Sequence, residues 1–468
     1  MKKLVAAFVL LAVLVAAGVL AEQAGERERE YLWLIDQGDE ALSRGETFAA
    51  IEAYSGAIAL KRGSMLAFLK RGEAHHRRGD APEAMAAALR DLRTAAELQP
   101  GSTRTLEKLG DVNFKMRRYG NAAESYESYL RVDDRSATVF YKLALASRGA
   151  GRLTRAISAL QQAVKLNPAF HEAHYVLGLC LKDREQLAEA RAALDQAVST
   201  SPAFIPAREE LAAIHRFQDR TRDEIQELEV LAALDPAKPE RRIAVGLAHL
   251  RAGNREHAVN TLRRAAERFP DHVGVYAALG QIWLEAAEER EDPSDVRKAL
   301  EALAPVAGQS TASSETLGHY GRALVLAGQH VQAEQILREA AQRFPTDPEV
   351  LPHYASVAQR LGHLEDARQA LLRYSILVDD DRDQDAHAVR IADLSLQLND
   401  AATAVSWYQK SAWLNSADAP LLARFADAQA RAGQVDAARA TIRRALDKDP
   451  DSPSVRAIER RLQSLHAR

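Results

Sequence analysis

The feature that most constrains the fold of this chain is an internal repeat with a period of about 34 residues. Self-similarity at a fixed period of this length is typical of repeat architectures, in which each unit packs only on its neighbours. A stack of small units is therefore expected in place of the about three ordinary domains that this chain length would suggest. Prolines mark the period, because they recur at spacings of two, one, one and one repeat lengths: Pro100, Pro168, Pro202, Pro236 and Pro270.

Residues 31–452 divide into twelve repeat units. Twelve units of the regular length leave a short excess, which we assign to insertions in the second unit, in the eighth unit, and between the tenth and eleventh. The insertion in the eighth unit, around Glu288 to Asp295, is predicted to lengthen its turn. Residues 453–468 are predicted to form a C-terminal capping helix. The unit boundaries are 31–64, 65–102, 103–136, 137–170, 171–204, 205–238, 239–272, 273–313, 314–347, 348–381, 385–418 and 419–452.

Each unit reads as a helical hairpin, because its apolar residues follow helical spacing in two blocks separated by a turn. The eighth position is Gly or Ala in all twelve units, as at Gly178, and the twentieth is Ala in eleven of them. Small side chains at fixed positions predict that the two helices of a hairpin approach each other closely. Larger residues at the seventh and twenty-fourth positions, such as Leu177 with Leu194, are expected to fill the space around these contacts.

This pattern resembles the tetratricopeptide repeat (TPR), a helix-turn-helix unit of about 34 residues. The resemblance implies an all-α fold, a right-handed superhelical solenoid of TPR helical hairpins, preceded here by one N-terminal hydrophobic helix. It also implies a concave groove, formed by the first helices of the units, that binds partner proteins. The unit that matches best carries the family's signature residues Leu177, Gly178, Ala190, Leu194, Ala197 and Pro202.

The resemblance places positions 2, 5, 9, 12 and 13 of each unit on the groove. Units one to three carry acidic residues at the ninth position, Asp39, Glu73 and Asp111. The middle units carry tyrosines and leucines beside a basic row, which would grip a partner segment through aromatic faces and charge-assisted hydrogen bonds. A solvated helix face explains the same pattern equally well. The predicted partner-binding residues are Tyr141, Leu145, Arg148, Tyr175, Leu179, Lys182, Arg216 and Arg251.

The stretch 1–30 has the pattern of an export element. Lys2 and Lys3 precede an unbroken apolar run from Leu4 to Ala21, and a charged stretch follows it. The length of the run suits either a cleaved signal peptide or a single-pass membrane anchor. Because the lysines keep the N-terminus in the cytoplasm, the repeats would lie in a bacterial periplasm, either anchored in the inner membrane through residues 4–21 or released by cleavage after Ala21. A cytoplasmic protein that buries its first helix in another way is the third alternative.

Composition and motifs argue against several classes of function. A formal charge of -3 gives no basic excess for binding nucleic acid. The single cysteine, Cys180, rules out internal disulfides and cysteine-built metal sites. The sequence has no phosphate-binding glycine loop, no nucleophile elbow and no HExxH motif. We therefore predict no catalytic residues, metal or cofactor, and we assign His171 and His174 to packing.

Together these observations predict a non-enzymatic protein-protein interaction scaffold in the bacterial cell envelope. Its groove would bind segments of other envelope proteins. Resemblance to exported TPR proteins suggests a role in organising polysaccharide secretion, pilus assembly or cytochrome maturation. The alternative is a periplasmic solenoid that binds or guides a polysaccharide, with Tyr141 and Tyr175 stacked on sugar rings.

Overall fold

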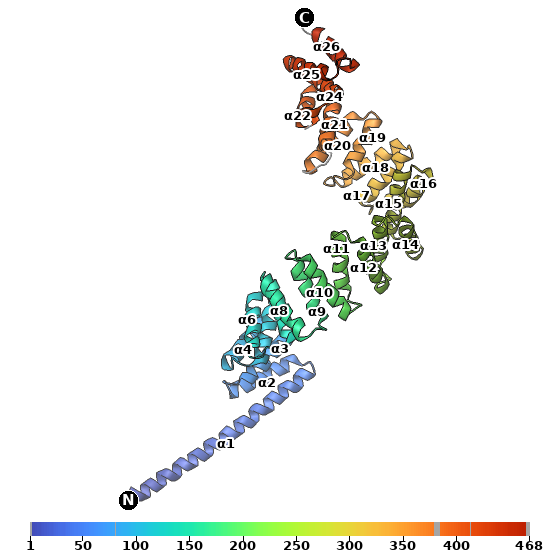
Figure 1. Ribbon diagram of the computed structural model, residues 1–468. Helices are drawn as coiled ribbons and strands as arrows, with labels where there is room; N and C mark the ends of the chain where they lie inside the picture. The colour runs from blue at the N-terminus through green and yellow to red at the C-terminus, as the bar shows by residue number, and fades with distance from the viewer. Residues whose placement is uncertain (1, 80, 379–383, 412, 465–468) are drawn as a thin grey trace. The chain divides into compact units, whose positions relative to one another are not determined.

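The structure is a computed structural model that describes residues 2–79, 81–378, 384–411 and 413–464, with most side chains from Leu14 onward (Figure 1). Every regular element in these residues is an α-helix, which confirms the predicted all-α class. The helices form two compact units, Met1–Glu227 and Leu228–Arg468. We call them the N-terminal unit and the C-terminal unit and describe each by itself.

Helices in the N-terminal unit pair in sequence, α1 with α2, α3 with α4, and so on to α9 with α10, and each pair packs on the next. The pairs are therefore stacked hairpins, as a solenoid requires. The helices are α1 (Lys2–Ser43), α2 (Thr47–Leu60), α3 (Met65–Arg77), α4 (Pro82–Leu98), α5 (Thr103–Lys115), α6 (Tyr119–Leu130), α7 (Ala137–Gly149), α8 (Leu153–Leu166), α9 (His171–Lys182), α10 (Leu187–Thr200) and α11 (Ile205–Phe217), and the boundary between the units falls within α12 (Thr221–Leu234).

The C-terminal unit repeats the arrangement, and α26 packs on the last hairpin, α24 with α25. Its helices are α13 (Pro239–Arg251), α14 (Arg255–Arg268), α15 (Val273–Arg290), α16 (Pro293–Ala307), α17 (Ser314–Leu326), α18 (His330–Arg343), α19 (Leu351–Arg360), α20 (Leu364–Leu377), α21 (Gln384–Gln397), α22 (Ala401–Lys410), α23 (Trp413–Ser416), α24 (Ala419–Arg431), α25 (Val435–Lys448) and α26 (Pro453–Ser464).

Local sequence signals fix the ends of these helices. The hydroxyls of Ser64, Ser102 and Ser136 accept hydrogen bonds from backbone amides further along the chain, which starts α3, α5 and α7. A serine in this position satisfies a backbone amide that the first turn leaves without a partner. After α7 and α13 the chain turns through Gly151 and Gly253, whose φ angles of 73° and 74° favour glycine.

The eighth position of the unit lies inside the hairpin, facing the twenty-fourth position. A Cβ atom added at Gly178 would lie 2.6 Å from Cγ of Leu194, and one at Gly246 would lie 2.7 Å from Cγ of Leu262. Gly110 faces the ring of Tyr126 in the same way. The predicted close approach is therefore present, and a single buried side chain from the second helix fills the space.

The predicted separate hydrophobic helix at the N-terminus is not found. Instead α1 runs without a break from Lys2 to Ser43, so the first repeat begins in the middle of a 42-residue helix. The stretch from Glu22 to Glu30 contains no proline and is rich in helix formers, so nothing ends the helix there. Residues 14–30 are exposed, and Tyr31 is the first buried residue among the described side chains.

A search of the described residues finds no helix that is both long enough and apolar enough to cross a membrane. The side chains of residues 4–13, which belong to the predicted apolar run, lie outside the described residues.

The insertion in the eighth unit does not lengthen the turn, so the prediction from the sequence was wrong on this point. It lengthens α15 to 18 residues, where α13 and α17 have 13. The helix ends at Arg290, the next residue, Glu291, adopts the left-handed conformation with φ 54°, and Asp292 then caps α16. The reason is local, because residues 285–290 are all Glu, Ala or Arg, which favour helix, and Pro293 then sets the start of the next helix.

Candidate protein-binding surface

The predicted acidic row in units one to three is used between successive hairpins. Asp39 accepts hydrogen bonds from Tyr54 Oη, at 2.6 Å, and from Lys70 Nζ of the next hairpin, also at 2.6 Å. Glu73 forms a bidentate pair with Arg104, at 2.9 and 2.8 Å. These acids therefore join repeats to each other, and they do not form an open negative strip.

A tyrosine, an aspartate and a lysine or arginine recur together as a hydrogen-bonded set, which we call the inter-repeat triad. In the N-terminal unit Asp111 accepts from Tyr126, at 2.9 Å, and from Lys142 Nζ, at 2.8 Å. Burial raises the pKa of Tyr126 well above its usual value, and the nearby Asp111 carboxylate adds to the rise. At Asp39, burial would raise the pKa, but hydrogen bonds from Lys70 and Tyr54 outweigh it and lower the pKa.

A third inter-repeat triad lies in the C-terminal unit. There Asp393 accepts a hydrogen bond from Tyr408 and pairs with Arg424 Nε at 3.2 Å. In each triad the tyrosine follows the aspartate by 15 positions and the cation follows it by 31. Our sequence reasoning missed this motif, although the fixed spacing is a signal that could have revealed it.

Predicted groove residues from α7 line a cavity of about 580 Å³ in the N-terminal unit, which we call the α7 cavity. Its apolar wall includes Tyr141, whose ring packs on Phe170 with 5.0 Å between centroids. Burial raises the pKa of Tyr141, so the phenol stays neutral near pH 7. The complete lining is His76, Asp111, Phe114, Lys115, Tyr126, Thr138, Tyr141, Lys142, Leu145, Phe170 and Glu172.

A second cavity, of about 630 Å³, lies at the C-terminal end of α11, and we call it the α11 cavity. Phe217 lines it with 77% of its surface exposed, beside Ile214, Ala213 and Leu187. Lys182 and Glu185 supply its charged edge. Such exposure of a large aromatic residue beside a cavity is typical of an interaction surface.

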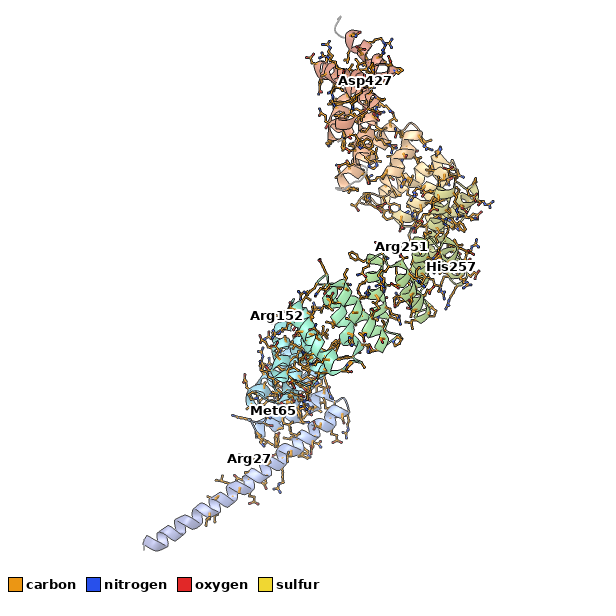
Figure 2. All side chains as sticks on the ribbon, in the orientation of Figure 1. Arg27, Met65, Arg152, Arg251, His257 and Asp427 are labelled. Carbon is orange, nitrogen blue, oxygen red and sulfur yellow. The ribbon has the colours of Figure 1, made fainter. Side chains whose placement is uncertain are left out.

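The structure brings together only part of the predicted partner-binding set. Tyr141 and Leu145 line the α7 cavity, and Lys182 lines the α11 cavity. Tyr175 and Leu179 are half-buried on α9, with the Tyr175 ring 5.3 Å from that of Phe204. Arg148 and Arg216 lie near the ends of α7 and α11, and Arg251 ends α13 in the C-terminal unit (labelled in Figure 2).

Three cations of the predicted basic row, Arg148, Lys182 and Arg216, each lie close to an acidic residue. Arg148 Nη2 lies 3.1 Å from Asp183, and Lys182 Nζ lies 2.5 Å from Glu210. Arg216, which is mostly exposed, lies 4.0 Å from the buried Glu224. Each cation is thus partly neutralised by an acid from a following segment, which weakens the expectation that the row alone attracts an acidic partner.

The residues with metal-binding or nucleophilic chemistry are engaged in other contacts. Glu334, His363 and Asp366 lie close enough to share a cation, but Arg338 donates to Glu334 at 2.9 Å and to Asp366 at 3.3 Å. The guanidinium group of Arg338 therefore already pairs with both carboxylates, as a metal ion would. His174 is buried against the carbonyl of Pro168, and burial raises the pKa of Cys180.

Sequence comparison now assigns the family. Profiles described as tetratricopeptide repeat match residues 35–103, 107–159 and 141–203, residues 209–382, and residues 395–462. They cover most of the chain, and the chain therefore belongs to the tetratricopeptide repeat family. No curated protein sequence matches it.

Several solved structures match the chain at low identity. MamA from Desulfovibrio magneticus RS-1 is 20% identical, with 37% of this chain and 97% of that chain covered, at a TM-score of 0.35. YrrB, described as a TPR protein with an unusual peptide-binding site, is 21% identical, with 40% and 94% covered, at 0.35. Yeast Tom70 is 12% identical, with 82% and 100% covered, at 0.40. The family assignment rests on the sequence profiles.

Proposed function

We propose that this chain is a non-enzymatic protein-interaction scaffold whose N-terminal unit binds a segment of a partner protein along α7, α9 and α11. The observation that carries the proposal is the pair of cavities lined by Tyr141 and Phe217, both on first helices of their repeats, which the family uses for its groove. Membership of the TPR family supports a role in protein binding and gives no reason to expect a catalytic site.

Apolar anchoring is the main source of affinity in this proposal. Most of the accessible surface inside the two cavities is apolar, and a buried apolar side chain gains roughly 1.5–3 kcal/mol relative to an exposed one. The surface pairs Arg148–Asp183 and Lys182–Glu210 lie nearby and exchange partners with charged groups of the bound segment. They contribute register and specificity more than affinity.

A protein segment suits these cavities better than a sugar. Tyr141 and Tyr175 each pack against a phenylalanine, at 5.0 and 5.3 Å between ring centroids, which leaves less open ring face for a sugar to stack on. A glycan array with the full-length chain tests the polysaccharide alternative, and binding that is lost in a Tyr175→Ala variant would favour it.

Photocrosslinking tests the proposal and identifies the partner. A photoreactive phenylalanine analogue placed at position 217 in cells should give a discrete crosslinked product, identifiable by mass spectrometry. The matched control is position 48, since Phe48 is also exposed, at 66%, but lies on α2 away from both cavities. Equal crosslinking at the two positions, or none at position 217, would contradict the proposal.

We also propose that the scaffold acts in the bacterial cell envelope. Support comes from the lysine pair and the apolar run at residues 4–21. Partners would then be envelope proteins, and the assembly served would be polysaccharide secretion, pilus assembly or cytochrome maturation.

Two measurements test this location. A reporter that is active only outside the cytoplasm, fused after Arg468, should give signal, and N-terminal sequencing separates cleavage after Ala21 from a retained anchor. A silent reporter beside a folded, full-length fusion would overturn the proposed location.

A further inference from the structure

Helix α15 is longer than the other first helices in the described part of the C-terminal unit, and its last turn lines a cavity. Its extra turn extends the wall beside α16 and the end of α17, and a cavity of about 650 Å³ lies there. We call it the insertion cavity. Its apolar lining comes from three helices and includes Ala287, Val296, Leu300 and Leu326. Leu326, the last residue of α17, is 44% exposed, so part of this apolar lining faces solvent.

Several acidic residues lie beside the insertion cavity, and most of them are paired: Glu289 lies 2.8 Å from Arg255, and the buried Asp295 lies 2.8 Å from Lys298. The segment from Glu285 to Asp295 contains six acidic residues and one arginine, whereas the whole chain is nearly balanced at -3. Glu288, at the edge of the cavity, is held by Arg322 at 2.6 Å. Glu291 also lines the cavity, is exposed, and makes no side-chain hydrogen bond or ion pair within the part of the chain that the structure describes.

The charge and shape together specify an occupant. We propose that the insertion cavity is a second docking site, which binds a partner segment carrying one bulky apolar side chain flanked by lysine or arginine. The apolar side chain covers Leu326 and Val296, and a flanking cation pairs with Glu291. An acidic segment is disfavoured because the carboxylate of Glu291, which has no cation partner among the described residues, would repel it. The one basic group in the lining, Arg297, is 72% exposed and lies 3.6 Å from Glu301.

This inference does not depend on the proposed groove, because the insertion cavity lies wholly in the C-terminal unit. Either site can therefore fail without the other. The left-handed residue Glu291 is a suitable place for a probe, because asparagine tolerates this conformation and removes the charge.

Fluorescence anisotropy with the full-length chain tests the proposal. The probe is a fluorescein-labelled peptide of sequence GKKLKKG, compared with GEELEEG and with GKKGKKG at low salt. We expect GKKLKKG to bind at least about fivefold more tightly than either of the others, since each of them lacks one part of the recognition. Raising the salt concentration should weaken the binding, because exposed charges are screened.

Two variants and a matched control locate the binding. Leu326→Ser and Glu291→Asn should each weaken the binding of GKKLKKG, by about fivefold and about threefold. Leu166→Ser is the control, because Leu166 also ends a helix, α8, and is 43% exposed. Its affinity should equal that of the wild type. Failure of the wild type to prefer GKKLKKG, or unchanged binding in Glu291→Asn with an unchanged melting curve, would overturn the proposal.

Discussion

Tyr126 donates a hydrogen bond of 2.9 Å to Asp111 within one hairpin, and Asp111 in turn accepts from Lys142 of the next hairpin. Tyr126 is buried, while the carboxylate of Asp111 lies near the surface. The neutral phenol is therefore in the interior, and the Asp111–Lys142 ion pair lies closer to solvent. The same geometry at Asp39 and Asp393 shows that this is a recurring way of joining successive repeats.

Removing the Tyr126 hydroxyl should destabilise the N-terminal unit. Tyr126→Phe keeps the packing against Gly110 but removes a hydrogen bond to a charged group, at a cost of about 1–2 kcal/mol. Urea unfolding followed by circular dichroism measures the change. Tyr119→Phe is the control, because Tyr119 packs on Phe114 without a hydrogen bond through its hydroxyl among the described contacts. An equal effect of both variants would contradict the role of the inter-repeat triad.

Adding one methyl group inside a hairpin should be costly. Gly178→Ala would place a Cβ atom 2.6 Å from Cγ of the fully buried Leu194, and overpacking of this kind costs about 1–3 kcal/mol. Gly120→Ala is the opposite case, because nothing lies within 4 Å of the added atom on helix α6. There we expect a stabilisation of about 0.5–1 kcal/mol. Thermal melts of the two variants should therefore shift in opposite directions.

Stability around α17 should fall at acidic pH. Burial lowers the pKa of His319 to about 4, and the charge of Arg322 acts in the same direction while Glu288 opposes it. Because the unfolded state binds the proton first as the pH falls from about 6.5, stability is full above that pH and is lost as the pH drops towards 4. Hydrogen exchange of the α17 amides at pH 7 and pH 5 measures the loss.

The variant His319→Gln should reduce this pH dependence without removing it. His353, on the neighbouring α19, also has a pKa lowered mainly by desolvation, and it remains in the variant. An identical ratio of exchange rates at the two pH values in wild type and variant would show that His319 does not carry the effect.

The basic row should matter less for stability than its charge suggests. Replacing Arg148, Lys182 and Arg216 together by Ser removes two surface ion pairs, each worth about 0–1 kcal/mol, and the longer 4.0 Å contact between Arg216 and Glu224. We expect nearly unchanged melting, with partner capture reduced and less dependent on salt. Phe217→Ser should reduce capture more strongly. The reverse order, with the triple variant the more severe, would mean that charge dominates recognition.

The helical hairpins could be predicted because their signals are local and repeated. Gly178 and Leu194 stand at the eighth and twenty-fourth positions of one unit, so the period alone indicated that they share an interface. The groove was only partly predictable. Tyr141 and Lys182, which the spacing selected, each line a cavity, but the ion partner of Lys182 is Glu210 in the next repeat, which no single-unit pattern indicates.

Boundaries that depend on the absence of a signal were predicted less well. We expected a separate helix before Tyr31, but nothing between Ala21 and Tyr31 ends a helix, so α1 continues. The insertion near Glu288 was predicted to form a longer turn, although its residues favour helix up to Glu291. In both places the helix propensity of the local residues indicates the observed boundary, whereas the boundary expected from the 34-residue repeat was wrong.

The Tyr126–Asp111–Lys142 contact has a direction along the chain. Acid and phenol come from one hairpin and the ammonium group from its successor, so an array cut at an arbitrary residue leaves a carboxylate facing water or a lysine without its acid. Loss or duplication of a complete module preserves the register of both halves. A deletion that crosses such a contact should therefore remove whole modules, and an engineered shortening should respect the same step.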